Sequence, residues 1–160
     1  MKRAKQKLPY KEGDWFAVPL RTGGYSVGLV ARAPGNGVIL GYFFGTQYDT
    51  PPKEESVMEL SGNDVILVTL FGDKGLAQGQ WPIITRTSPW DRSKWPVPTF
   101  GRTLELDGQT VAWRIEYSDV DLAHVVQETR TSPQSIQDLP EEGLWGHLAL
   151  EEYLTKLLTK

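Results

Sequence analysis

Short apolar runs broken by Gly, Pro and Asn-Gly turns recur along most of this chain. Sixteen Gly and eleven Pro in 160 residues supply the breaks. Residues 38–44 and 65–71 are apolar throughout, as in strands covered on both faces. Residues 14–20 and 25–31 alternate instead, and residues 81–86 form a shorter run. Runs of this length between turn residues predict β-strands, so we expect a mostly β fold.

The clearest prediction is a hairpin formed by residues 100–106 and 109–117. Asp107-Gly108 between them is a two-residue turn, since these residue types tolerate the positive φ that such a turn needs. The turn pairs Leu104 with Val111 and Arg102 with Trp113. This register places six apolar residues on one face, namely Leu104, Leu106, Val111, Trp113, Ile115 and Tyr117.

The C-terminal quarter predicts one edge strand, one loop and one helix. Residues 124–131 form the strand and residues 132–143 the loop, while the apolar residues of 148–158 follow helical spacing. The polar residues 50–61 form a surface loop with at most one helical turn. The resulting class is α+β and mainly antiparallel: a bent sheet or partial barrel of about six to eight strands, with the C-terminal helix packed on it.

The length predicts one domain over residues 10–160, preceded by a flexible basic N-terminus at residues 1–9. The chain has no Cys, and its N-terminus lacks the apolar run of a signal peptide, so we expect a cytoplasmic protein. No apolar run is long enough to span a membrane. Residues 118–160 carry eight Asp and Glu against three Lys and Arg, which argues against a nucleic-acid partner.

The residues that most catalytic sites need are missing. The chain has two His, no Cys nucleophile, no Gly-x-Ser-x-Gly elbow and no phosphate-binding glycine loop. We therefore predict no catalytic residue, no metal ligand and no cofactor, and the sequence favours a binding protein over an enzyme. Only carboxylate chemistry remains open, because a carboxylate pair can be assembled from distant residues.

The segment 88–98 is the candidate contact surface, since it combines two Trp, three Pro and alternating charges. Trp and Arg dominate binding hot spots, because they bury a large area with few rotatable bonds. We predict partner-binding roles for Trp90, Asp91, Arg92 and Trp95. The alternative is that both rings close the end of the sheet and Asp91 pairs locally with Arg92 or Lys94.

Several motifs carry a resemblance to a known family. They include Tyr10-Lys11-Glu12-Gly13-Asp14-Trp15, Val38-Ile39-Leu40-Gly41-Tyr42, Phe71-Gly72-Asp73-Lys74-Gly75, Trp90-Asp91-Arg92 and Trp95-Pro96. Together they resemble the immunity protein 26 family, also labelled the immunity 26/phosphotriesterase HocA family. The resemblance implies a bacterial protein of a polymorphic toxin system that neutralises its cognate toxin by direct binding.

Two alternatives stay open beside that function. The second half of the family label implies a small phosphotriester hydrolase, which would use Asp73 and Asp91 with Arg92 on a phosphoryl oxygen. A β-rich module that binds a peptide or ligand in an aromatic groove near Trp90 and Trp95 is the other. For the immunity function, the acidic C-terminal quarter predicts a basic toxin. The sequence leaves the oligomeric state open.

Overall fold

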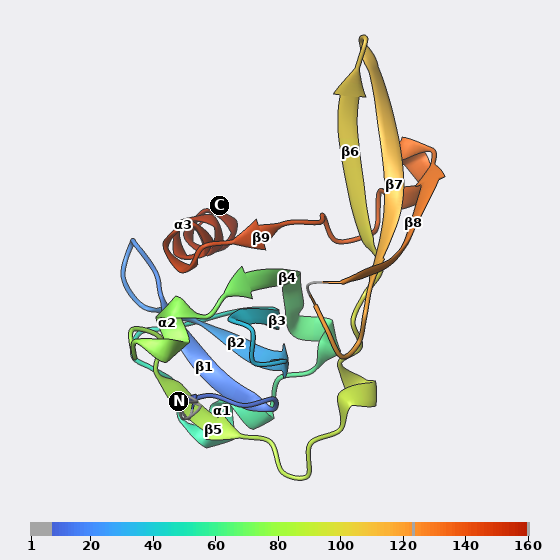
Figure 1. The fold of residues 1–160 in the computed structure, drawn as a ribbon. Coiled ribbons are helices and arrows are strands. Elements are labelled where there is room, and N and C mark those ends of the chain that lie inside the picture. Colours follow the sequence, from blue (N-terminus) through green and yellow to red (C-terminus); the bar gives the residue numbers. More distant parts are fainter. Residues whose placement is uncertain (1–7, 123, 160) are drawn as a thin grey trace, which may run out of the picture.

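The computed structural model describes residues 8–122 and 124–159, which form nine strands in two sheets (Figure 1). The larger sheet has the order β5-β1-β2-β3-β4-β9 and is antiparallel except for the β4–β9 pair. Its strands are β1 (Asp14–Pro19), β2 (Tyr25–Arg32), β3 (Val38–Tyr48), β4 (Val65–Gly72), β5 (Ile83–Arg86) and β9 (Leu144–Trp145).

The smaller sheet is antiparallel and has the order β6-β7-β8. Its strands are β6 (Phe100–Leu106), β7 (Gln109–Tyr117) and β8 (Val125–Thr131). Three α-helices complete the fold: α1 (Glu54–Met58), α2 (Lys74–Ala77) and α3 (His147–Leu158). Short 3₁₀ turns lie at Gly62–Asp64, Arg92–Lys94 and Pro133–Ile136.

The expected α+β class with a C-terminal helix is confirmed. The described residues form nine strands, more than the six to eight expected, and these divide between two separate sheets that do not close into a barrel. The helix begins at His147, one residue earlier than the periodicity predicts, and the predicted helical turn within residues 50–61 is α1. Of the predicted flexible N-terminus, residues 1–7 lie outside the part of the chain that the structure describes.

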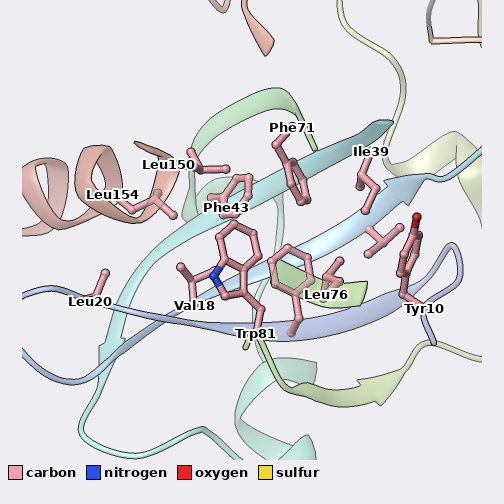
Figure 2. Close-up of a cluster of buried hydrophobic side chains, with 12 residues drawn as sticks. Tyr10, Val18, Leu20, Ile39, Phe43, Phe71, Leu76, Trp81, Leu150 and Leu154 are labelled. Carbon is pink, nitrogen blue, oxygen red and sulfur yellow. The ribbon is translucent and has the colours of Figure 1, made fainter. Parts of the chain in front are cut away.

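One face of the larger sheet packs against α3 and α2. Figure 2 shows Leu150 and Leu154 of α3 pointing towards the aromatic side chains of this core, among which is Trp81. The Trp81 ring stacks on Phe16 with centroids 5.7 Å apart and planes at 7°. Gly75 lies directly against it, and a Cβ there would come within 2.6 Å of the indole. The first core is therefore a stack of aromatic rings closed by the C-terminal helix.

The opposite face of the larger sheet packs against the base of the smaller one. The contact is made by three buried side chains that pack against β1, β2 and β3, namely Phe100 of β6, Ile115 of β7 and Leu122. Strand β3 therefore lies between two cores, which explains why residues 38–44 are apolar throughout. The prediction that this run is a central strand covered on both faces is confirmed.

The β6–β7 hairpin has the predicted register, with Leu104 opposite Val111 and Arg102 opposite Trp113. Its turn residues Asp107 and Gly108 have φ of 51° and 78°, as a two-residue turn of this kind requires. The tip of the hairpin projects beyond the larger sheet (Figure 1). Leu104 and Leu106, which the apolar pattern assigns to the same face as Val111, are therefore left 49% and 46% exposed.

Candidate functional site

The tryptophan loop, residues 88–98, closes the edge of the second core. The Trp95 ring meets Tyr42 and Phe44 edge-on, with centroids 5.1 and 5.8 Å away. It also meets Trp15 at 90°, with centroids 6.2 Å apart. The Tyr42 hydroxyl donates a hydrogen bond to the backbone carbonyl of Pro96. Trp95 is one of the four predicted contact residues, and most of its ring therefore packs against other side chains of the same molecule.

Trp90 covers the turn that leads into β1. A Cβ on Gly13 would lie 3.2 Å from the Trp90 ring, and the φ of Gly13 is 90°. The Trp90 indole N–H donates to Glu12 Oε1 at 3.1 Å. The Trp90 side chain is half-buried, so part of it remains exposed.

Arg92 binds the same carboxylate as Trp90, that of Glu12, and extends this contact into an ion-pair network. Its Nε donates to Glu12 Oε1 at 2.8 Å and its Nη1 to Asp119 Oδ2 at 3.1 Å. The buried Arg32, at the end of β2, donates from Nε to Asp119 Oδ1 at 2.8 Å and from Nη1 to the carbonyl of Trp95. The network therefore ties the tryptophan loop to β2 and to the loop before β8.

Sequence reasoning missed three members of this network: Glu12, Arg32 and Asp119. They lie far apart along the chain, and only folding brings them together. Arg32 carries the single local signal, because it is a charged residue that continues an apolar strand. A cavity of about 390 Å³ lies beside the network, and its walls include Arg32, Arg92 and Asp119. Each Arg there already has a carboxylate partner.

Asp91 and Asp73, the carboxylates of the hydrolase alternative, have separate partners. Asp91 caps the Arg92–Lys94 turn, where hydrogen bonds from the hydroxyl and backbone N–H of Ser93 hold its pKa below the usual value. Asp73 instead accepts the hydroxyl of Tyr10 at 2.6 Å. Within the described residues, no three His, Asp or Glu side chains gather in a way that could hold a metal ion.

A second cavity lies on the aromatic side of the tryptophan loop. Its volume is about 370 Å³. The lining residues are Trp15, Met58, Leu60, Ser61, Gly62, Thr87, Lys94 and Trp95. The groove-binding alternative expects an aromatic groove near Trp90 and Trp95, and of these two residues only Trp95 lines this cavity, beside Trp15.

The arm, residues 97–142, is the part of the molecule that extends furthest from the larger sheet (Figure 1). It contains the smaller sheet and the segment that returns to β9. It carries nine Asp and Glu against three Arg and no Lys, whereas the rest of the chain carries fourteen Lys and Arg against eleven Asp and Glu. Five of those fourteen lie at positions that the structure does not describe. Among the described residues, the body carries nine Lys and Arg against eleven Asp and Glu, so most of the net negative charge lies on the arm.

The base of the arm is held by a second polar cluster. Arg102 donates from Nε to Glu142 Oε1 at 2.8 Å and from Nη2 to Glu128 at 3.1 Å. The Tyr117 hydroxyl donates to Glu142 Oε2 at 2.8 Å. Burial, the hydrogen bond to Glu142 and the charge of that carboxylate together raise the pKa of Tyr117 to about 12.

This raised pKa predicts a loss of stability at alkaline pH. The folded state holds the Tyr117 proton more tightly than the unfolded state does, so its contribution is full below the ordinary value of 10.0 and is lost as pH rises towards about 12. We expect Tyr117→Phe to flatten that decline. Absorbance titration at alkaline pH, with urea unfolding at matched pH values, measures it. An equally steep fall of the unfolding free energy between pH 10 and pH 12 in wild type and variant would contradict the prediction.

No helix among residues 8–122 and 124–159 combines the length and apolar character needed to cross a membrane.

Fold and surface together define an antiparallel α+β protein with a projecting acidic arm. The chain matches the family model described as Immunity protein 26 over residues 11–112, and it belongs to that family. Comparison with curated proteins finds no match, and comparison with solved structures finds none.

The matched range contains β1 to β6, the start of β7 and the whole tryptophan loop. It therefore includes all four predicted contact residues and also Glu12 and Arg32, while Asp119 lies beyond it. Membership of this family indicates an immunity role, and an immunity role implies a toxin as protein partner.

Proposed function

We propose that this protein neutralises a cognate toxin of a bacterial polymorphic toxin system by binding it directly, in the cytoplasm. The observation that carries the proposal is the family match over residues 11–112. The structure supports it with an arm that extends away from the larger sheet and offers an exposed surface (Figure 1). Direct binding explains immunity with no chemistry beyond surface complementarity.

The charge of the arm supports a basic toxin as the partner. Nine acidic residues against three Arg give the arm a net negative charge. Complementary fields speed diffusional encounter and disfavour partners of like charge. A fast encounter suits an immunity protein, because a toxin must be intercepted before it acts.

The test uses the product of the gene adjacent to this protein's own, purified in a catalytically inactive form. We expect it to co-purify with this protein, and we expect co-expression of this protein to restore growth of cells that make the active toxin. The association rate should reach about 10⁸ M⁻¹s⁻¹ at low salt and fall at least tenfold at high salt, where exposed charges are screened. Absence of both binding and rescue would refute the proposal.

Variants of this complex also examine the predicted role of the tryptophan loop. Asp91 is exposed, and Asn retains the ability to cap the turn that follows. Asp91→Asn therefore removes the charge while keeping the local fold. If this loop contacts a basic toxin, the variant weakens binding severalfold with no change in unfolding free energy. Unchanged affinity would remove Asp91 from the contact surface.

A further inference from the structure

The hydrogen bonds at the base of β6 show which of its backbone groups face away from β7. The Gly101 N–H donates to the Pro140 carbonyl at 2.9 Å, and the Gly101 carbonyl accepts from the Glu142 N–H at 2.8 Å. Both groups therefore point out of the sheet. Successive residues of a strand direct these groups to opposite sides, so Thr103 and Glu105 also point outwards.

The turn of the hairpin supports the same assignment. A two-residue turn is flanked by a pair that exchanges both backbone hydrogen bonds, which here is Leu106 with Gln109. Leu104 and Leu106 thus bond to β7, and the alternate residues Thr103 and Glu105 do not. Segment 140–142 pairs with the edge only at Gly101. Among the residues that the structure describes, no backbone hydrogen bond from outside the hairpin reaches Thr103 or Glu105, so four backbone groups there face solvent.

The opposite edge of the same sheet is open too, but its side chains are engaged. The alternation continues through β7 to β8, so that Glu128 and Arg130 direct their backbone groups outwards. Glu128 is paired with Arg102, and the Arg130 guanidinium lies 5.7 Å from the Trp113 ring centroid. The β7–β8 register also shifts at Glu116 and Tyr117, which adds local twist.

The outer edge of β6 has little protection against strand pairing. Natural edge strands are blunted by charged side chains, especially Lys, by Pro or by bulges. Within residues 103–106, Glu105 is the one charged residue, and it repels acidic strands but attracts basic ones. Residues 103–106 contain neither Lys nor Pro, and their pairing with β7 shows no register shift. The two half-exposed leucines, Leu104 and Leu106, stand on one face of this edge. An added strand would therefore find open hydrogen-bonding groups beside apolar surface.

We propose that the outer edge of β6, at Thr103 and Glu105, pairs with an extended basic segment of the toxin. This inference rests on the proposed function. The added strand would extend the smaller sheet, with backbone bonds to Thr103 and Glu105 and apolar contacts to Leu104 and Leu106. Glu105 and Asp107 supply negative charge at the same edge. A second copy of this chain fits less well, because pairing there would bring two acidic arms together.

Matched proline variants on the two edges test the inference against the inactive product of the adjacent gene. Glu105→Pro removes one negative charge and one outward backbone N–H from the β6 edge. Glu128→Pro removes one negative charge and one outward backbone N–H from the β8 edge. Pro is tolerated where an edge N–H faces solvent. We expect Glu105→Pro to weaken binding at least tenfold and Glu128→Pro less than threefold. Glu105→Gln, which keeps the N–H, should weaken it by less than Glu105→Pro.

Amide hydrogen exchange by NMR gives a second measurement that needs no variant and therefore no assumption about variant folding. In the free protein, the amides of Thr103 and Glu105 should exchange rapidly, as should those of Glu128 and Arg130. In the complex, only the first pair should become protected.

The outcomes separate the two proposals. If wild type binds and protects cells while Thr103 and Glu105 stay unprotected and Glu105→Pro binds normally, the inference is overturned and the proposed function stands. Protection of Glu128 and Arg130 instead would move the contact to β8 and also overturn it. Protection of Thr103 in the protein alone at high concentration would identify a second copy as the occupant. If wild type neither binds nor rescues, the proposed function fails, and the inference fails with it.

Discussion

Replacing Trp81 by Ala is expected to lower the free energy of unfolding by about 3–5 kcal/mol, the usual cost of deleting a buried Trp ring. Trp81 is 1% exposed and stacks on Phe16. It also meets Phe71 at a centroid distance of 5.6 Å. Its loss would leave a cavity between the larger sheet and α3. Urea denaturation followed by far-UV circular dichroism measures the change.

Trp81→Phe is the matched control, because it keeps an aromatic ring in the stack and should cost clearly less than Trp81→Ala. The smaller ring also gives up the weak indole hydrogen bond to Glu151, which is 3.4 Å long. A loss below about 1 kcal/mol for Trp81→Ala, the size expected of an ordinary surface substitution or less, would contradict the assignment of Trp81 to the centre of this core.

Trp95→Ala should cost about 2–3 kcal/mol, somewhat less than a fully buried Trp because a minor part of the side chain stays exposed. The reason is that Trp95 contacts Trp15, Tyr42 and Phe44 at once. Thermal and urea unfolding of the purified variant measure the loss. Toxin affinity of the folded variant then separates a packing role from a contact role.

Trp90→Ala is the control for that experiment. Trp90 contributes one hydrogen bond to Glu12, covers Gly13 and packs at the rim of the second core without the three ring contacts of Trp95, so its loss should cost about 1–2 kcal/mol. If Trp95→Ala were as stable as wild type and lost only toxin binding, Trp95 would be a binding hot spot and not a core residue. If both variants were unstable to the same degree, the distinction drawn between the two rings would be wrong.

Local sequence features predicted much of the fold, since the physical cause of each element lies within a few residues. Asp107-Gly108 set the register of the hairpin through the positive φ of both residues. The periodic leucines of α3 predicted a helix whose buried side chains Leu150 and Leu154 face the sheet. The division of the strands into two sheets has no such local cause, because strand pairing depends on partners distant in sequence.

The candidate site was only partly predictable. The tryptophan loop is conspicuous in composition, and Trp90, Asp91, Arg92 and Trp95 remain predicted contact residues. Their intramolecular partners Glu12, Arg32 and Asp119 come from three other parts of the chain. Each of these partners is an ordinary charged residue when taken alone, so no spacing rule could have joined them.

The hairpin tip shows where local pattern ends and tertiary structure begins. Alternation along the strands was enough to place Leu104 and Leu106 on the same face as Val111, because side-chain direction in a strand has a period of two. Burial also needs an opposing surface, and only the folded molecule shows where that surface stops. The hairpin runs past the edge of the larger sheet, so Val111 is 8% exposed while Leu104 is 49% exposed. The alternating sequence pattern therefore determined which face of the hairpin carries the leucines. The arrangement of the two sheets determined that the outer end of that face stays exposed.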